Sequence, residues 1–345
     1  MPTKKELAFD EKYLITCTGY APDFIDGKIK ISLDSILNDD QKRSLATAKG
    51  NSKGLLNYCD LTILYNAKRK VPFFAAYNID GAAGIKRAAR PAFQTDPRIE
   101  AKFQLDDGFY DLRKDITEFE IGHMASNNEM GRGKNGIVKA YQTFHFTNSV
   151  PQAEKLNTGL WKGLESYIIK EAATVKNNKR ICVFTGPILT SEDPGYRLSP
   201  SFKIPLLFFK VIVFQSVKGF YSTAFMMSHE KKMIEDNMFV KPPPVRRVRG
   251  LAPEVGYFID FKYKKVFQVN ITFLEQYSGL KFQWKGVKPV IVPEEKRLLE
   301  KIKSIKDAAD AKKHLARNIP LQTTRQDVTK RELETGQYLV NMILP

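Results

Sequence analysis

The sequence has few cysteines and histidines, and it has no long uninterrupted apolar run. Its three cysteines, Cys17, Cys59 and Cys182, are too few and too scattered for a disulfide framework, and their odd number favours a reducing compartment. The four histidines and the cysteines do not have the spacing of a zinc site. The apolar stretch at residues 204–214 is interrupted by Lys210 and is typical of a buried strand rather than a membrane helix. We therefore predict no membrane partner.

The first residues, MPTKKELAFDEKYLITC, lack the apolar core of a signal peptide and are too acidic for a transit peptide. This absence predicts a soluble, cytoplasmic protein. A protein without a signal that is delivered by a specialised secretion machine would have the same kind of N-terminus.

Hydrophobic and basic residues are abundant. Of the 345 residues, 43% are hydrophobic and 11% are aromatic, which is enough for a substantial core in one large domain or two modest ones. The 55 Lys and Arg residues outnumber the 38 Asp and Glu residues, which gives a net charge of +17. Because such a surface attracts polyanions and releases their counterions on binding, nucleic acid is the first partner to consider.

The first candidate site residue is His123. The alternating character of residues 116–120 predicts a short strand, and Gly122 would let the backbone turn sharply where His123 leaves the sheet. An imidazole with a near-neutral pKa can take a proton from water and activate it for attack on phosphorus. Alternatively, His123 is a half-buried residue that only makes hydrogen bonds to its neighbours.

A second candidate segment begins at Asn157. Apolar residues with helical spacing predict a helix that packs one face into the core: Leu160, Trp161, Leu164, Tyr167 and Ile168. Asn157 lies at the start of this helix, where its carboxamide oxygen can serve as a ligand of Mg²⁺, and Glu165 lies two turns later. A cation held there would neutralise charge on a scissile phosphate. The alternative is that Asn157 caps the helix and Glu165 is solvated.

Together these two segments resemble a known family. The sequence FEIGHMAS at residues 119–126 resembles the Asp-Arg-Gly-His-Met-Ala-Pro signature of the DNA/RNA non-specific endonucleases, whose active site is a ββα-metal motif. The sequence FTNSVPQAEKLNTGLWKGLE at residues 146–165 resembles the second block of the family. The resemblance extends over residues 19–282 and includes several apolar stretches that match the strands of the family.

The resemblance implies a role for each matching residue. His123 would be the general base, Asn157 the direct protein ligand of Mg²⁺, for which Mn²⁺ can substitute, and Glu165 a group that orients metal-bound water. The polar residues around the metal waters would be Glu120, Asn148 and Gln152. Arg90 is the best match for the arginine that contacts phosphate, and Arg87 is a competing match.

Three residues depart from the family signature. Glu120 stands in place of Asp, Ile121 in place of Arg, and Ser126 in place of Pro. Because the missing Arg would supply positive charge close to the phosphate, its loss predicts slow cleavage unless another cation substitutes. The cations that could substitute are Arg90, Arg132 and Lys134.

Two basic segments are candidates for contact with the nucleic-acid backbone. The first is the loop NNEMGRGKNG at residues 127–136, which carries Arg132 and Lys134. Its Gly-x-Gly-Lys sequence lacks the spacing and the Ser or Thr of a Walker A loop, which excludes an ATPase. The second is the Pro-rich segment KPPPVRRVRG, which carries Arg246 and Arg247. Alternatively, the first is a simple connector and the second a solvated loop.

We predict an α+β protein with a central antiparallel β-sheet flanked by helices and a ββα-metal motif at its active face. Residues 1–18 would be an N-terminal segment, residues 19–285 the nuclease domain, and residues 286–345 a helical extension. The extension contains the amphipathic pattern PEEKRLLEKIKSIKDAADAKKHLARN, which would cover the core or another subunit. It is the expected place for homodimerisation, or for an inhibitor or activator to act.

The function implied by the resemblance is Mg²⁺-dependent hydrolysis of phosphodiester bonds in DNA and RNA. Little sequence preference is expected, since contacts to the backbone carry no sequence information. A free nuclease of this kind would endanger its host, so we predict a regulated effector. The alternative, motivated by Ile121, is a catalytically weak or inactive nucleic-acid-binding protein on a decayed nuclease fold.

Overall fold

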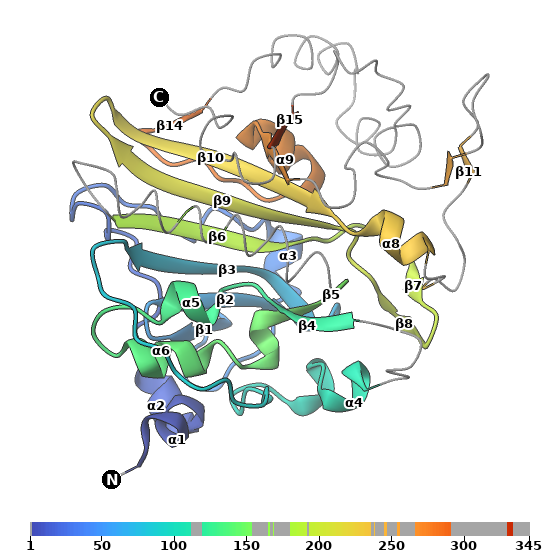
Figure 1. Ribbon diagram of the computed structural model, residues 1–345, viewed down its shortest axis with the longest axis horizontal. Helices are drawn as coiled ribbons and strands as arrows, with labels where there is room; N and C mark the ends of the chain where they lie inside the picture. Colours follow the sequence, from blue (N-terminus) through green and yellow to red (C-terminus); the bar gives the residue numbers. More distant parts are fainter. Residues whose placement is uncertain are drawn as a thin grey trace.

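A large β-sheet is the main feature of the chain (Figure 1). The computed structural model describes residues 2–111, 119–153, 165, 168, 180–191, 193–235, 238, 245–246, 254–255, 266–290 and 330–333. The strands of the sheet are β1 (Leu55–Tyr58), β2 (Leu61–Asn66), β3 (Val71–Asp80), β6 (Arg180–Ile188), β9 (Leu207–Ser216), β10 (Gly219–Ser228), β13 (Val266–Val269), β14 (Val287–Pro289) and β15 (Lys330–Leu333). Their order is β1-β2-β3-β6-β9-β10-β13-β15 with antiparallel neighbours, and β14 pairs with β10 in parallel.

Short helices and two-stranded ribbons surround the sheet. The helices are α1 (Lys4–Phe9), α2 (Glu11–Thr16), α3 (Asp39–Lys42), α4 (Asp107–Tyr110), α5 (Asn127–Met130), α6 (Gly136–Gln142), α8 (Glu230–Glu235) and α9 (Ile271–Ser278), with 3₁₀ turns η1 (Ala101–Phe103) and η2 (Phe146–Asn148). The ribbons pair β4 (Phe119–His123) with β5 (Ser149–Ala153), β7 (Gly195–Tyr196) with β8 (Ser199–Lys203), and β11 (Val245–Arg246) with β12 (Glu254–Val255). None of the helices that the structure describes is long and apolar enough to span a membrane.

The inner strands of the sheet are buried on both faces. Every residue of β2 is buried, as is every residue of β3 except the last. A strand that is covered on both faces is a nearly continuous apolar run rather than an alternating one. Aromatic and β-branched side chains pack well on such a pleated surface, which is why LTILYN and VPFFAAYNID form these two strands.

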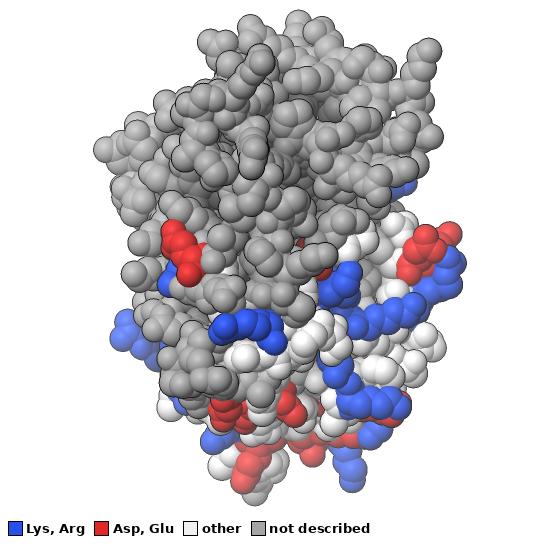
Figure 2. Space-filling model, turned by 90° about the vertical axis from the view of Figure 1, so that its right-hand side faces the viewer, with Lys and Arg blue, Asp and Glu red and all other residues white. Residues whose placement is uncertain are grey.

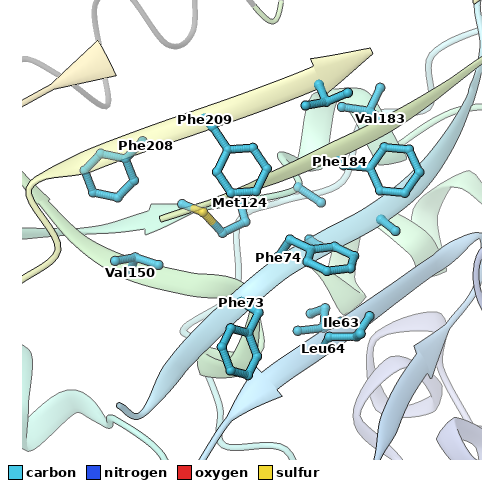
Figure 3. Packing of buried hydrophobic residues seen from close by; sticks show 14 of the residues in the cluster. Ile63, Leu64, Phe73, Phe74, Met124, Val150, Val183, Phe184, Phe208 and Phe209 are labelled. Carbon is cyan, nitrogen blue, oxygen red and sulfur yellow. The ribbon is translucent and has the colours of Figure 1, made fainter. Parts of the chain in front are cut away.

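The core joins the sheet to the β4–β5 ribbon. Figure 3 shows Phe74, Phe184 and Phe209 of the sheet in one packed group with Met124, the residue that follows β4. Val150 of β5 belongs to the same buried cluster. Each fully buried side chain of this size contributes roughly 1.5–3 kcal/mol to folding. The ribbon is therefore fixed on the sheet by apolar packing.

The predicted α+β class with a central antiparallel sheet is confirmed. Of the ββα motif, the structure describes the two strands β4 and β5. The predicted helix that begins at Asn157 lies outside the described residues, except for Glu165 and Ile168, which are both buried.

The described residues beyond residue 285 include two strands of the sheet, where we expected a helical extension. β14 pairs with β10 and β15 pairs with β13. Pairing of this kind satisfies backbone groups that an edge strand would otherwise leave open. Near the other end of the chain, Leu14 of α2 belongs to the core. The division into three parts remains a prediction, and the amphipathic segment of the extension lies outside the described residues.

Candidate active site

The candidate site is built on the ribbon of β4 and β5. The two strands are antiparallel, with His123 opposite Ser149 and Glu120 opposite Gln152. The 3₁₀ turn η2, which directly precedes Ser149, contacts β2 and β3. The main sheet therefore supports the end of the ribbon that carries His123.

His123 is the last residue of β4, and its side chain lies between two aromatic rings. The ring centres of Phe93 and Phe144 are 4.7 Å and 4.8 Å from that of His123. The residue is only 6% exposed, and its Nε2 atom has no hydrogen-bond partner in the described part of the chain. Burial, together with the charge of Arg90, lowers the pKa of His123 to about 3. The imidazole is thus neutral at pH 7, and both roles that we considered for His123 stay predictions.

The segment that carries Arg90 runs beside this end of the ribbon. The backbone N–H of Gln94 donates a hydrogen bond of 2.9 Å to the carbonyl oxygen of Phe144. The carbonyl oxygen of Gln94 accepts another of 2.9 Å from the N–H of Phe146, the first residue of η2. The guanidinium carbon of Arg90 lies 6.0 Å from the centre of the Phe144 ring, and its charge acts on the pKa of His123. Arg87 is exposed. These contacts favour Arg90 over Arg87 as the cation next to His123.

We expected Gly122 to turn the backbone away from the sheet. Instead, Gly122 lies within strand β4. The absence of a side chain serves another purpose. A Cβ atom at this position would lie 2.2 Å from Oε1 of Gln152 and 2.4 Å from its Cδ atom. Gly122 therefore makes room for the Gln152 side chain. The amide of Gln152 is buried, and neither its oxygen nor its nitrogen has a hydrogen-bond partner among the described residues.

Replacing Gly122 with Ala should displace Gln152. Under the nuclease function that the sequence predicts, the rate of cleavage should fall by roughly 10²-fold, the typical cost of a displacement of about 1 Å in an active site. The unfolding free energy should fall by roughly 1–3 kcal/mol through overpacking. Chemical denaturation and single-turnover cleavage would measure the two effects. In the double variant Gly122→Ala with Gln152→Ala the clash is absent, so its stability should return. A double variant as unstable as Gly122→Ala would contradict this account.

Asn148 holds the turn that follows His123. Its Oδ1 accepts a hydrogen bond of 3.0 Å from the backbone N–H of Ala125, and its Nδ2 donates to the carbonyl oxygens of Ala125 (2.8 Å) and Thr143 (2.9 Å). The residue is completely buried. These contacts position the backbone next to His123. The predicted role of Asn148 near metal waters stays a prediction.

Helix α5 occupies the start of the segment that we described as a basic loop. Ser126 and Glu129 form a capping box, in which the Ser126 hydroxyl accepts from the backbone N–H of Glu129 and the Glu129 carboxylate accepts from that of Ser126. The Ser-x-x-Glu sequence is a known signature of a helix start and could have revealed this helix. Ser126 in place of the family proline is therefore a capping residue.

Lys210 of β9 is completely buried beneath this helix start. Its Nζ donates hydrogen bonds to the Tyr77 hydroxyl (3.0 Å) and to Oε1 of Glu129 (3.1 Å). It also forms an ion pair of 3.6 Å with Oε1 of Glu165. Glu129 and Lys210 were not predicted as site residues, although a lysine within the apolar run at residues 204–214 was a signal of a buried charge.

Glu165 therefore shares one ammonium group with a second carboxylate. Burial and the negative charge of Glu129 raise the pKa of Glu165 to about 8, against the opposing effects of Lys210 and a hydrogen bond from Ser126. Ser126 lies three residues after His123 in the chain. Ser126 thus connects the carboxyl group of Glu165 to the segment that carries His123.

The segment that carries Arg87 pairs with the one that carries Arg132 and Lys134 through the backbone bridge between Ile85 and Arg132. Arg132 is buried, and its guanidinium donates a hydrogen bond of 3.0 Å to the carbonyl oxygen of Ala83, so it stabilises the loop rather than standing at the surface. Lys134 is exposed, as is Arg87. Arg246 lies in β11, and Arg247 lies outside the described residues.

Figure 2 shows one face of the molecule, on which described Lys and Arg side chains are spread across the middle and described Asp and Glu side chains are more frequent toward the lower end. Exposed cations of this kind can contact phosphate groups without reading sequence.

The residues that the structure describes contain no cluster of three or more His, Cys, Asp or Glu side chains that could hold a metal ion. The predicted ligand, Asn157, lies outside them. Among the described site residues, Gln152 and Glu165 have side-chain oxygens that could surround a bound Mg²⁺, because Mg²⁺ prefers oxygen ligands. The amide oxygen of Gln152 has no described hydrogen-bond partner. A site with one direct protein ligand is consistent with this donor set.

Comparison with known proteins gives a family and a relative. The family model for DNA/RNA non-specific endonucleases matches residues 41–288. The uncharacterized protein y4fB of Sinorhizobium fredii is 31% identical over 276 residues, which cover 76% of this chain and 40% of that protein. The chain thus spans less than half the length of this relative. A crystal structure of the EndoG/EndoGI complex, described as the mechanism of EndoG inhibition, is similar with a TM-score of 0.47 and 19% identity, covering 66% of this chain and 84% of the other.

Proposed function

The chain belongs to the DNA/RNA non-specific endonuclease family, and from this premise we propose that it is a Mg²⁺-dependent endonuclease acting on DNA and RNA. The observation that carries the proposal is the neutral, buried His123 with an unpartnered Nε2 next to Arg90. Contacts with the phosphate backbone would give little sequence preference.

His123 would act as the general base. Its Nε2 takes a proton from the water that attacks phosphorus, and such a group typically contributes 10²–10⁴-fold to the rate. A pKa of about 3 makes the imidazole a weak base in the free protein. A phosphodiester anion next to it would favour the imidazolium and raise this pKa. The substrate itself would therefore strengthen the base that acts on it.

Asn157 would hold Mg²⁺, with Gln152 and Glu165 among the oxygen groups around it. When bound, the ion would neutralise charge on the scissile phosphate. The Gln152 amide, buried without a described partner, has room next to Gly122 and is free to hydrogen-bond. Lys210 and Ser126 would keep the Glu165 side chain in place. Glu120 lies opposite Gln152 in the ribbon, at the position where we predicted a supporting acid.

Ile121 favours a second possibility, in which the protein binds nucleic acid and cuts it slowly or not at all. The Ile121 side chain is partly buried against the core, so this position contributes packing where the family has a positive charge. Arg90 would then be the main cation at the phosphate. Loss of one such contact costs on the order of 10²–10³ in rate.

The test is degradation of plasmid DNA and of a structured RNA by the full chain. We expect cleavage of both substrates in Mg²⁺ and none in excess EDTA, because the ion supplies charge neutralisation that the described side chains do not replace. Gel electrophoresis and a salt titration of binding would be measured on the same preparation. Salt-sensitive binding without turnover at any Mg²⁺ or Mn²⁺ concentration would refute the enzyme and favour the binding protein.

We also propose that the activity is restrained through residues 286–345, by an inhibitor, an activator or homodimerisation. β14 and β15 connect this range to the main sheet. A deletion after Lys285 would remove both strands along with any restraint. Variants that test restraint should therefore retain residues 287–289 and 330–333.

A further inference from the structure

Two of the three cysteines meet in the fold. Cys17 follows helix α2, and Cys59 lies in the turn between β1 and β2. Their Sγ atoms are 3.7 Å apart, although the residues are 42 positions apart in the sequence. Both side chains are partly exposed, so a small oxidant can reach them. Cys182, in contrast, is completely buried in β6.

The surroundings of the pair favour thiol chemistry. The Tyr13 hydroxyl lies 3.4 Å from Sγ of Cys59, and Nε2 of Gln142 donates a hydrogen bond of 3.6 Å to Sγ of Cys17. The hydrogen bond from Cys17, followed by that from Tyr13, lowers the pKa of Cys59 to about 6 against the effect of burial. The thiolate is the nucleophilic form of cysteine. Burial raises the pKa of Cys182 to about 12, which leaves that thiol unreactive.

We propose that Cys17 and Cys59 form a reversible disulfide bond, a modification site that does not depend on the proposed nuclease function. The Sγ atoms need to approach by about 1.7 Å to reach bonding distance, which side-chain rotation can supply. The oxidant is a low-molecular-weight disulfide such as oxidised glutathione.

The exchange is balanced in two steps. The Cys59 thiolate attacks one sulfur of the small disulfide and forms a mixed disulfide, and the other half leaves as a thiolate. Cys17 then loses its proton and attacks Sγ of Cys59, which expels the second half as a thiolate. Two protein thiols are oxidised by two electrons in total, and one small disulfide is reduced to two thiols, which take up the two protons.

The bond would join the N-terminal helices to the scaffold of the candidate site. Gln142, the last residue of α6, contacts both sides of the pair, since its Oε1 accepts a hydrogen bond of 2.9 Å from the backbone N–H of Cys59. Helix α1 packs on α6, and Phe144, two residues after α6, touches His123. Oxidation would therefore make this side of the molecule more rigid.

The experiment treats the full chain with oxidised or reduced glutathione and measures intact mass, disulfide-linked peptides and melting temperature. We expect loss of two hydrogens in mass, a linked peptide pair containing Cys17 and Cys59, and a melting temperature higher by roughly 5–10 °C in the oxidised form. Cys17→Ser and Cys59→Ser should abolish all three changes.

Cys182→Ser is the matched control, and it should keep the mass change and the linked peptides. A stable glutathione adduct on Cys59 that Cys17 does not resolve would overturn the proposal. So would persistence of both free thiols in the oxidised sample, or a linkage that includes Cys182. None of these outcomes depends on whether the protein cleaves nucleic acid.

Discussion

We expect the replacement of His123 with Ala to lower the rate of phosphodiester cleavage by roughly 10²–10⁴-fold, because the variant would lack the proposed general base. Binding of nucleic acid should change little, because the buried imidazole is neutral at pH 7 and contributes no positive charge to binding. Single-turnover cleavage in Mg²⁺ and a salt titration of binding would measure the two quantities separately.

The matched control for this variant is His145→Ala. His145 is also buried, its Nε2 also lacks a described hydrogen-bond partner, and its ring packs on Phe9 and Tyr58. Both substitutions remove an imidazole from an aromatic pocket, so both should cost stability. Only the substitution at His123, where Arg90 stands next to the ring, should stop cleavage. If His145→Ala were the inactive variant, or if both cut at the wild-type rate, the assignment of His123 would fail.

The strands could be predicted from the sequence because their signal is local. Runs such as LTILYN and VPFFAAYNID are apolar throughout and rich in aromatic and β-branched residues, and they are the inner strands β2 and β3. The order of the strands, their register and which of them share a sheet depend on contacts between distant parts of the sequence. The strand β15 pairs with β13 across more than sixty residues of sequence, and no pattern in KREL announces this pairing.

The site could be predicted in part. The family blocks indicated His123 and Glu165 as candidates, and these assignments stay predictions; the blocks did not show what surrounds the two residues. Gly122 was misinterpreted because its purpose, space for the side chain of Gln152, is visible only when the two strands are paired. Arg132 was expected at the surface because an arginine in a Gly-rich segment is usually solvated, but here its hydrogen bond to Ala83 accompanies burial.

Charges that meet across the fold were the hardest to predict. Glu129 and Lys210 are separated by 81 positions, and each alone has a simple interpretation, as a helix-capping acid and as an interruption in an apolar run. Lys210 contacts both Glu129 and Glu165, which makes the three residues one cluster of two carboxyl groups and one ammonium. The buried acidic groups depend on the ammonium, so its removal leaves them without a cation.

Replacing Lys210 with Met should therefore be strongly destabilising. The variant leaves the carboxyl groups of Glu129 and Glu165 buried without a cation, and breaking a buried ion pair from one side typically costs 3–5 kcal/mol. The pKa of Glu165, already raised to about 8, should rise further without the ammonium. A carboxyl group whose pKa is raised by folding binds more protons in the folded state than in the unfolded state. The deficit relative to the wild type should therefore grow as pH rises above about 7, where Glu165 loses its proton in the folded wild type but keeps it in the variant, and it should change little between pH 7 and 5.

Urea denaturation at pH 6 and pH 9 would measure this deficit, and two further variants make it specific. The double variant Lys210→Met with Glu129→Gln buries only one carboxyl group without a cation instead of two. It should therefore recover part of the lost stability. Lys139→Met is the matched control, because Lys139 also forms an ion pair, 2.8 Å from Asp60, but the Asp60 side chain is half exposed. Water can solvate that carboxylate when the lysine is absent, so the cost should be below about 1 kcal/mol. Equal losses in Lys210→Met and Lys139→Met, or a deficit that does not change with pH, would show that the buried cluster does not carry the energy assigned to it.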